Sequence, residues 1–100
     1  MSTPGTDIRK DSRLNGGRYS HRFADGSEAE MIYVADGSDV AIITHTYTPP
    51  RHRGRGVAAA LVARAVSDFR PEGRKVVPSC WFARQEFDAH PEWSDLLLRE

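Results

Sequence analysis

Apolar residues in the first half of the chain fall into three runs, Arg18 to Ala24, Glu28 to Ala35 and Asp39 to Thr48. Each run has the length of a β-strand and is bounded by turn residues. The pairs Asp25-Gly26 and Asp36-Gly37 separate the runs. Asp-Gly is a strong hairpin signal because glycine tolerates the positive φ of tight turns. The pattern therefore predicts a three-stranded antiparallel meander.

The ends of this meander give weaker expectations. Val40, Ile42 and the residues around them predict that its third strand is the most buried one. Ile8 to Lys10 predicts a short additional first strand, and Ser2 to Gly5 a loose tail. Pro49-Pro50 ends the third strand, since proline donates no hydrogen bond to a sheet.

From Gly56 onward the apolar residues recur at the spacing of a helix. The apolar stripe consists of Val57, Ala58, Leu61, Val62, Ala65, Val66 and Phe69. Arg70-Pro71-Glu72-Gly73 contains both a proline and a glycine and ends this helix.

The last third of the chain predicts a strand and then a second helix. Lys75 to Cys80 forms the strand, parallel to the third strand of the meander because a crossover helix joins them. Trp81 to His90 forms the helix, and Trp93 to Leu98 packs the C-terminal end down. The side chains that this helix turns toward the core are Trp81, Phe82 and Phe87. The expected fold class is α/β, or α+β.

Composition narrows the class of protein. The chain has 100 residues and is expected to form one domain over residues 17–100, after a tail or short strand at 1–16. Its formal net charge is zero, which argues against nucleic acid as a partner, and no apolar run reaches the length of a membrane span. A single cysteine, Cys80, suits a reducing compartment, so the expected location is the cytoplasm.

The segment from Thr48 to Ala59 carries the strongest chemical signal. It lies between a buried strand and an amphipathic helix. Gly54 and Gly56 remove side chains where the backbone turns into the helix, so several N–H groups can converge on one point. A helix start has unpaired donors and about half a positive charge, and together these form an anion site.

Positive side chains at the same place strengthen this interpretation. Cations near a helix N-terminus are unfavourable by roughly 0.3–1 kcal/mol each. A sequence chosen for stability alone would place Ser, Asp or Asn there as a cap. The chain instead has Arg51, His52, Arg53 and Arg55. A bound phosphate would relieve this conflict, so the loop predicts a phosphate-containing ligand.

Two common phosphate motifs do not fit. A P-loop needs Gly-Lys-Ser/Thr, which is absent here. Gly54-x-Gly56-x-x-Ala59 has the spacing of a dinucleotide fingerprint, but that fold needs an acidic residue about 20 positions further on and additional βαβ units.

The loop resembles a known family. Arg53-x-x-Gly56-x-Ala58 is similar to the Q/R-x-x-G-x-G/A pyrophosphate loop of the GNAT superfamily of N-acetyltransferases. A short acetyltransferase-like subgroup of about this length is resembled more closely, over roughly Arg18 to Leu97. The segments that carry this likeness are His45-Thr46, Pro49-Pro50, Arg53 to Ala58, Val76 to Cys80 and His90-Pro91-Glu92.

The resemblance implies a minimal GNAT-like fold that binds acetyl-CoA or coenzyme A. Backbone amides of the loop would hold the pyrophosphate, and the pantetheine would lie in a splay between the strands that end near Tyr47 and Cys80. The residues expected to bind the cofactor are Tyr47, Thr48, Arg53, Gly54, Arg55, Gly56, Val57, Ala58 and Ala59.

Two side chains are candidates for the chemistry. In the subgroup resembled, a cysteine matching Cys80 sits near the thioester, where a thiolate can accept an acetyl group or activate the acceptor. His45 lies late in the third strand and is a candidate general base. For both residues a purely structural role stays open: a small buried residue for Cys80 and a hydrogen-bonding residue for His45. No His, Cys or carboxylate cluster has metal-ligand spacing, so no metal is expected.

The sequence therefore predicts an acetyl-CoA-dependent N-acetyltransferase. Backbone N–H groups of the third strand would polarise the thioester carbonyl. The amine acceptor, small molecule or protein, is not encoded in any motif, and the chain is expected to be a monomer or a homodimer. Two alternatives stay open: a module that binds coenzyme A without turnover, and a weaker one in which Arg51 to Arg55 bind nucleic acid.

Overall fold

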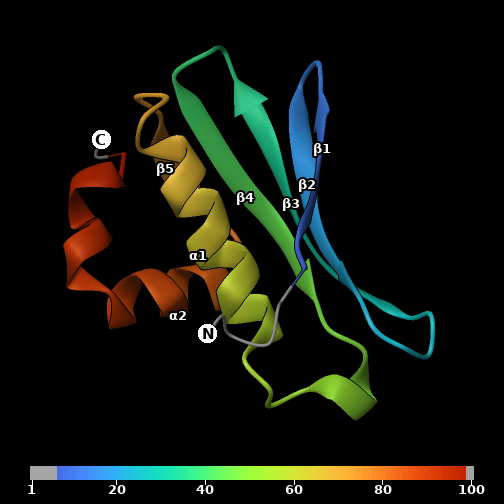
Figure 1. Ribbon diagram of the computed structural model, residues 1–100. Coiled ribbons are helices and arrows are strands. Elements are labelled where there is room, and N and C mark those ends of the chain that lie inside the picture. The colour runs from blue at the N-terminus through green and yellow to red at the C-terminus, as the bar shows by residue number, and fades with distance from the viewer. Residues whose placement is uncertain (1–6, 99–100) are drawn as a thin grey trace.

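Five strands lie side by side in one sheet, in the order β1-β2-β3-β4-β5, in the computed structural model, which describes residues 7–98 (Figure 1). The strands are β1 (Arg9–Arg13), β2 (Gly16–Arg22), β3 (Glu28–Asp36), β4 (Val40–Tyr47) and β5 (Lys75–Pro78). The helices are α1 (Val57–Phe69) and α2 (Trp81–Ala89), with short 3₁₀ segments η1 (Pro50–His52) and η2 (Pro91–Leu96). This mixed sheet confirms the predicted fold class.

The first four strands form an antiparallel meander, as the Asp-Gly pairs predicted. Gly26 and Gly37 have φ of 88° and 67° in the two predicted turns. The first strand is longer than Ile8 to Lys10 predicted, and it pairs with β2 from Arg9 to Arg13. The missed signal was Asn15-Gly16, a hairpin pair of the same kind. The tail predicted at Ser2 to Gly5 lies outside the described residues.

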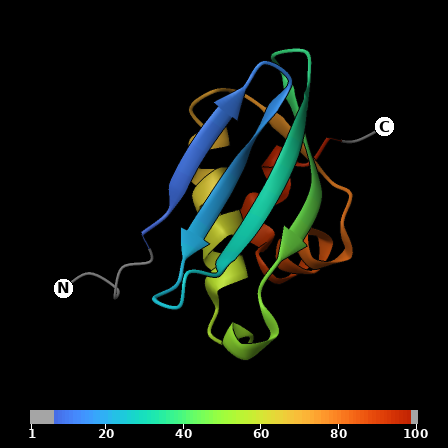
Figure 2. The same ribbon diagram turned by 90° about the vertical axis from the view of Figure 1, so that its right-hand side faces the viewer.

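The chain leaves β4, crosses over through α1 and returns as β5, which pairs parallel to β4 from Val40↔Lys75 to Ile43↔Pro78. Figure 2 shows the sheet in front with α1 and α2 behind it. Both helices therefore cover the same face. We refer to the other face, over which the described part of the chain places no helix, as the open face.

The core lies between α1 and the sheet. The side of α1 that faces the sheet buries Leu61, Val62, Ala65, Val66 and Phe69, which belong to the predicted apolar stripe. The sheet contributes Tyr19, Ala29, Met31, Tyr33, Ala41 and Ile43. All of these side chains point to the face that α1 covers.

Two burial predictions were wrong. β4 is not the most buried strand, because only Ala41 and Ile43 of its eight residues are buried, against four of the seven residues of β2. Four consecutive apolar residues do not reveal which alternate pair faces the core. Trp81, expected to face the core, is 75% exposed because it begins α2 on the side away from Ala83 and Phe87.

A polar network ties the sheet to the end of α1. The hydroxyl of Tyr19 donates to Asp68 Oδ2 over 2.8 Å, and Lys10 Nζ lies 3.4 Å from the same oxygen. Burial would raise the pKa of Asp68, but the Tyr19 hydrogen bond and the charges of Lys10 and Arg64 outweigh burial and hold that pKa below its usual range. The network joins β1, β2 and α1.

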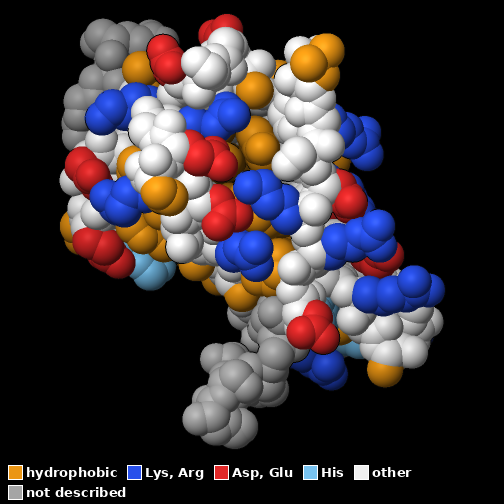
Figure 3. All heavy atoms as spheres, turned by 45° about the horizontal axis from the view of Figure 1, so that its top comes forward, with side chains coloured by type: hydrophobic (Ala, Val, Ile, Leu, Met, Phe, Trp, Pro, Cys, Tyr) orange, Lys and Arg blue, Asp and Glu red, His pale blue; other side chains and the backbone are white. Residues whose placement is uncertain are grey.

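Positive and negative side chains are mixed on the surface. Figure 3, in which the top of Figure 1 comes forward, shows Lys and Arg side chains interspersed with Asp and Glu. Ion pairs among the described residues include Arg9–Asp11 and Arg74–Glu72, at 3.4 and 2.9 Å. The side chains on this view therefore form no large area of one sign.

Asp68→Ala tests the network. The substitution leaves the Tyr19 hydroxyl buried without an acceptor, so we expect a loss of about 1–3 kcal/mol in the free energy of unfolding at neutral pH. Because the folded pKa of Asp68 is depressed, its contribution is present above its unfolded pKa of about 3.9 and is lost as pH falls through the lower folded value. The difference between variant and wild type should therefore shrink in strong acid, as measured by urea unfolding. Asp88→Ala, at an exposed position of α2, is the control, and an equal effect there would contradict this account.

Candidate functional site

The parallel pairing of β4 and β5 ends abruptly at Ile43. Its carbonyl accepts hydrogen bonds from the backbone N–H groups of both Ser79 and Cys80, at 2.9 and 3.1 Å. The chain then turns away into α2, while β4 continues to Tyr47. The edge of β4 that faces away from β3 is therefore without a strand partner from Thr44 to Tyr47. This is the splay that the resemblance implied.

A bulge lies in β4 at the same level. On β3, Ile32 and Tyr33 are consecutive, but their partners on β4 are His45 and Ile43. Thr44 is the extra residue, and its hydroxyl lies 3.4 Å from the carbonyl oxygen of Ile32. A bulge bends the strand and disrupts its ladder locally. Here it re-aims β4 where the strand separates from β5.

The loop that follows β4 leads to a helix start without a side-chain cap. Gly56 is the N-cap of α1, with φ 79° and ψ 12°, and the first turn contains no acidic residue. Gly54 also has a positive φ, of 83°. A Cβ atom added to either glycine would meet no atom within 4 Å. Both glycines are therefore required by backbone conformation, and the space beside them is open to a ligand.

The loop between β4 and α1 contacts the turn between β2 and β3. Asp25 Oδ2 accepts from His52 Nε2 over 3.0 Å and from Arg51 over 3.2 Å. The His52 ring stacks on Phe23 with 3.8 Å between ring centres, and only 12% of its side chain is exposed. We refer to Phe23, Asp25, Arg51 and His52 as the hairpin clamp. His52 is thus a packed residue, whereas from the sequence it was only grouped with the positive side chains of the loop.

Hydrogen bonds fix the Asp25 carboxylate. The hydroxyl and the backbone N–H of Ser27 donate to its Oδ1 over 2.6 and 2.9 Å. These bonds, followed by that of His52, hold the pKa of Asp25 well below its usual range. Asp25 is therefore a permanent anion that faces two of the positive side chains of the loop. A hollow of about 560 Å³ lies beside it, lined also by Pro49 and Pro50.

The three arginines of the loop consequently differ. Arg51 pairs with Asp25, and Arg53 donates from Nε to the carbonyl oxygen of Thr48 over 2.9 Å, which closes the loop on itself. Arg55 is exposed, and its side chain makes no hydrogen bond or ion pair with another described residue. Arg55 is the arginine best placed to contact a ligand outside the loop.

Cys80 lies at the point where the strands separate. Its Sγ is the N-cap of α2 and accepts from the backbone N–H of Ala83 over 3.3 Å. The hydroxyl of Thr46, on the last part of β4, lies 3.8 Å from the same sulfur. The structure thus brings Cys80 beside the end of β4, as predicted. It adds Thr46, which the sequence placed in a segment of family likeness but not among the candidate site residues.

His45 lies on the open face. Its side chain is 48% exposed, and Nε2 lies 3.2 Å from Glu30 Oε2. Neighbouring residues of a strand point to opposite faces. Because Thr46 contacts Cys80, His45 and Cys80 lie on opposite faces of β4 and do not form a cysteine–histidine pair. Tyr47, the last residue of β4, is also exposed.

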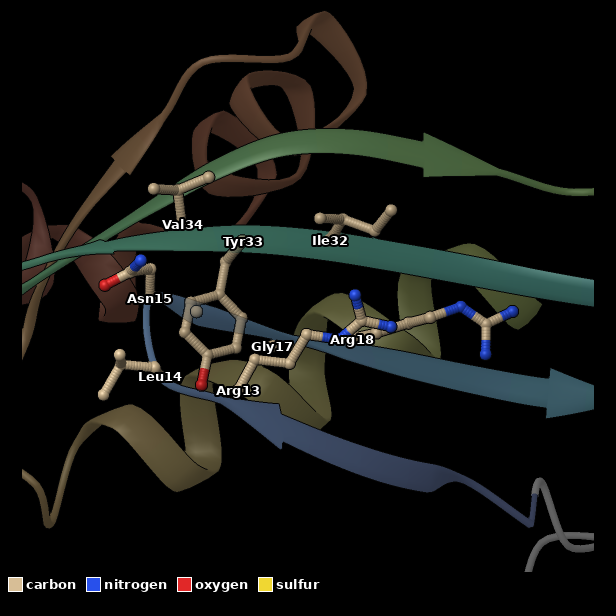
Figure 4. Close-up of a pocket in the computed structure, with 9 residues that line it drawn as sticks. Arg13, Leu14, Asn15, Gly17, Arg18, Ile32, Tyr33 and Val34 are labelled. Carbon is tan, nitrogen blue, oxygen red and sulfur yellow. The ribbon is translucent and has the colours of Figure 1, made fainter.

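A second hollow lies at the other end of the sheet. It measures about 380 Å³ and surrounds the turn between β1 and β2, with Leu14, Ile32 and Val34 among its lining residues (Figure 4). The ring of Tyr33 covers Gly17, where an added Cβ would lie 2.8 Å from a ring carbon. None of the predicted site residues lines this hollow.

These features define a class of protein: a meander, a crossover helix with a glycine-containing start, and a parallel strand that diverges from its neighbour at a bulge. A family model described as GCN5-related N-acetyl-transferase matches residues 18–96. The chain belongs to this family, and the class of its activity is acetyl transfer.

Individual relatives agree with this assignment. The chain is 28% identical over 88 residues to protein NATD1 of Danio rerio, a match that covers 86% of this chain and 73% of that protein. The NMR structure of a GCN5-like protein from Staphylococcus aureus superposes with a TM-score of 0.70 at 21% identity, covering 96% of this chain and 93% of the other. That likeness shows a shared fold.

Two further properties concern residues 7–98 alone. They contain no helix long and apolar enough to cross a membrane. Nor do they hold a group of three or more His, Cys, Asp or Glu residues arranged to bind a metal ion.

Asp25→Ala tests the hairpin clamp. The substitution removes the acceptor shared by Arg51 and His52, so the loop should open more often. We expect trypsin to cleave after Arg51, Arg53 and Arg55 several-fold faster, as measured by mass spectrometry of the fragments. Asp95→Ala is the matched control, because Asp95 is an exposed aspartate bonded to Arg70 over 2.7 Å far from the loop. Cleavage at the loop that is equally fast in both variants would show that the clamp does not hold it.

Proposed function

We propose that this protein transfers the acetyl group of acetyl-CoA to an amine and binds the coenzyme A pyrophosphate on the loop from Arg53 to Ala59. The observation that carries the proposal is the start of α1, which has no side-chain cap. The chain reaches it through Gly54 and Gly56, in the loop that follows the part of β4 without a β5 partner. The family gives the class of reaction, and these residues form the proposed binding site of the pyrophosphate.

The helix start fits a diphosphate. The backbone N–H groups of Val57, Ala58 and Ala59 belong to the first turn, where no intrahelical acceptor exists, and no side chain caps them. The side chains of this turn are small or apolar, and Gly56 leaves the approach open. Anions are stabilised at such a position by the helix dipole and by the free donors together. Arg53 and Arg55 add positive charge on the same side of the chain.

The pantetheine arm would run from this loop along the free edge of β4, past Tyr47 and Thr48 toward Ile43. Main-chain donors on that edge have no β5 partner, so they are available to an extended ligand and to the thioester carbonyl. Bound acetyl-CoA supplies the activated acetyl group. The protein's part is to orient it and to accept the proton of the attacking amine.

In the direct route, the amine nitrogen forms a bond to the thioester carbon while the carbon–sulfur bond breaks. The amine proton passes to His45, and the sulfur leaves as the coenzyme A thiolate, which is then protonated. In a covalent route, Cys80 would first take the acetyl group and then pass it to the amine. The two residues serve separate routes, because they lie on opposite faces of β4.

Gly56→Ala tests the binding loop, with Gly73→Ala as its matched control. The two glycines have φ of 79° and 72°, and neither added Cβ would meet an atom within 4 Å, so the backbone strain should be similar. Only the methyl group at residue 56 enters the proposed pyrophosphate site. We expect Gly56→Ala to weaken acetyl-CoA binding by about tenfold or more, or roughly 1.4 kcal/mol, and Gly73→Ala to bind like wild type. Isothermal titration calorimetry measures both. Wild type that binds no acetyl-CoA, or equal affinities in the two variants, would refute the site.

Intact mass spectrometry distinguishes the two routes. We expect no acetyl adduct when wild type is mixed with acetyl-CoA alone. The contacts of Cys80 Sγ are with the Ala83 N–H and the Thr46 hydroxyl, and no acidic or basic side chain of residues 7–98 bonds to it to take its proton. An adduct that forms in wild type and is absent from Cys80→Ser would assign the covalent route instead. Product formation with a panel of amines provides the accompanying test of turnover.

A further inference from the structure

We propose that Glu30 is a positioning residue that holds the His45 ring in one tautomer, with Nδ1 as the atom that receives the proton of the acceptor amine. The inference rests on the proposed function and adds to it a second residue, on a different strand. It also assigns the acceptor to the open face of the sheet.

The sheet register places the two side chains together. His45 stands opposite Ile32, and Glu30 stands opposite Tyr47, so Glu30 and His45 are diagonal neighbours on the open face. The distance from His45 Nε2 to Glu30 Oε2 is 3.2 Å. The bulge at Thr44 precedes His45 directly and brings it to the level at which β4 leaves β5.

Glu30 is itself held in place. Arg18 donates from Nε to Glu30 Oε1 over 2.7 Å, which leaves Oε2 for His45. The second arm of the same guanidinium donates to Glu28 Oε1, also over 2.7 Å. The hydrogen bond to Glu28, and after it the one to Glu30, raise the pKa of Arg18 above its already high value, so its charge is permanent. Arg18, Glu30 and His45 thus form a chain of side chains across β2, β3 and β4.

This geometry decides which ring nitrogen is free. A carboxylate has no proton to donate, so its negative charge 3.2 Å from Nε2 favours a proton on that nitrogen over a lone pair. The neutral ring then has its lone pair on Nδ1. Nδ1 makes no hydrogen bond to any residue of the described chain, and about half of the side chain faces solvent. The Nδ1 atom is therefore available to a molecule that approaches from the open face.

The arrangement suits a role in positioning better than a role in stability. Ion pairs at partly exposed positions contribute little to folding because solvent screens them. An ordered histidine base, in contrast, depends on the group that holds its second nitrogen. The structure offers an internal comparison, because Glu28 bonds to Arg18 as Glu30 does but does not contact His45.

The test combines three variants with two readouts. Glu30→Ala removes the acceptor at Nε2, Glu30→Gln keeps an oxygen there without the charge, and Glu28→Ala is the matched control. The first readout is the ¹⁵N spectrum of the His45 ring in the neutral form, which reports the tautomer without any ligand. The second is kcat and KM for acetyl-CoA with an amine that wild type acetylates.

We expect wild type, Glu28→Ala and Glu30→Gln to show the Nε2–H tautomer, and Glu30→Ala to show a mixture. His45→Ala should lower kcat about 10²-fold, the lower end for loss of a general base. Glu30→Ala should lower kcat roughly tenfold, a smaller loss because the base itself remains. Glu30→Gln should restore part of that loss. The KM for acetyl-CoA should stay near wild type throughout.

Two results would overturn the inference: a tautomer in Glu30→Ala identical to wild type, or losses of kcat that are equal in Glu28→Ala and Glu30→Ala. Absence of turnover with every amine would refute the proposed function and, with it, the proton transfer to Nδ1. In that case the ring spectra would still decide separately whether Glu30 sets the tautomer of His45.

Discussion

The carbonyl group of Ile43 sets the geometry of the site, because it accepts hydrogen bonds from two successive backbone N–H groups of the returning chain. A regular parallel ladder would continue along β4 to Tyr47 and leave no free edge. Here the double acceptance ends the ladder, and Cys80 becomes the cap of α2 in place of a strand residue. Three features lie at this level of the sheet: the bulge at Thr44, the start of the free edge of β4, and Cys80.

The sequence predicted those parts of the structure that depend on local chemistry. The Asp-Gly turns, the stripe of α1 and the parallel strand after the crossover each follow from residues close together in the chain, whereas the divergence of β4 and β5 was implied by the family resemblance. The buried side of β4 did not, since Val40 to Ile43 is apolar throughout and either alternate pair fits a core. The exposure of Trp81 was also missed, because it depends on how α2 begins after Cys80.

Contacts between residues far apart in the chain could not be predicted from the sequence, for a different reason. Nothing in the sequence links Glu30 to His45 or Asp25 to His52. The register of β3 against β4 brings Glu30 to His45, and the turn between β2 and β3 brings Asp25 to His52. The basic loop illustrates the same limit. It was predicted as one group of positive charges, but folding pairs Arg51 with Asp25, turns Arg53 onto the backbone and leaves Arg55 outward.

His45 and Cys80 lie on opposite sides of β4, so only this one strand separates the two side chains. A reactive carbonyl held along that edge would be open to the helix side and to the bare side of the sheet at once. The two reactants would then approach from opposite sides of the sheet, and neither would have to dissociate before the other could bind. Residues 7–98 place no helix over the open face, which leaves that face of the sheet less buried, and the acceptor would in this way have its own approach to the reaction.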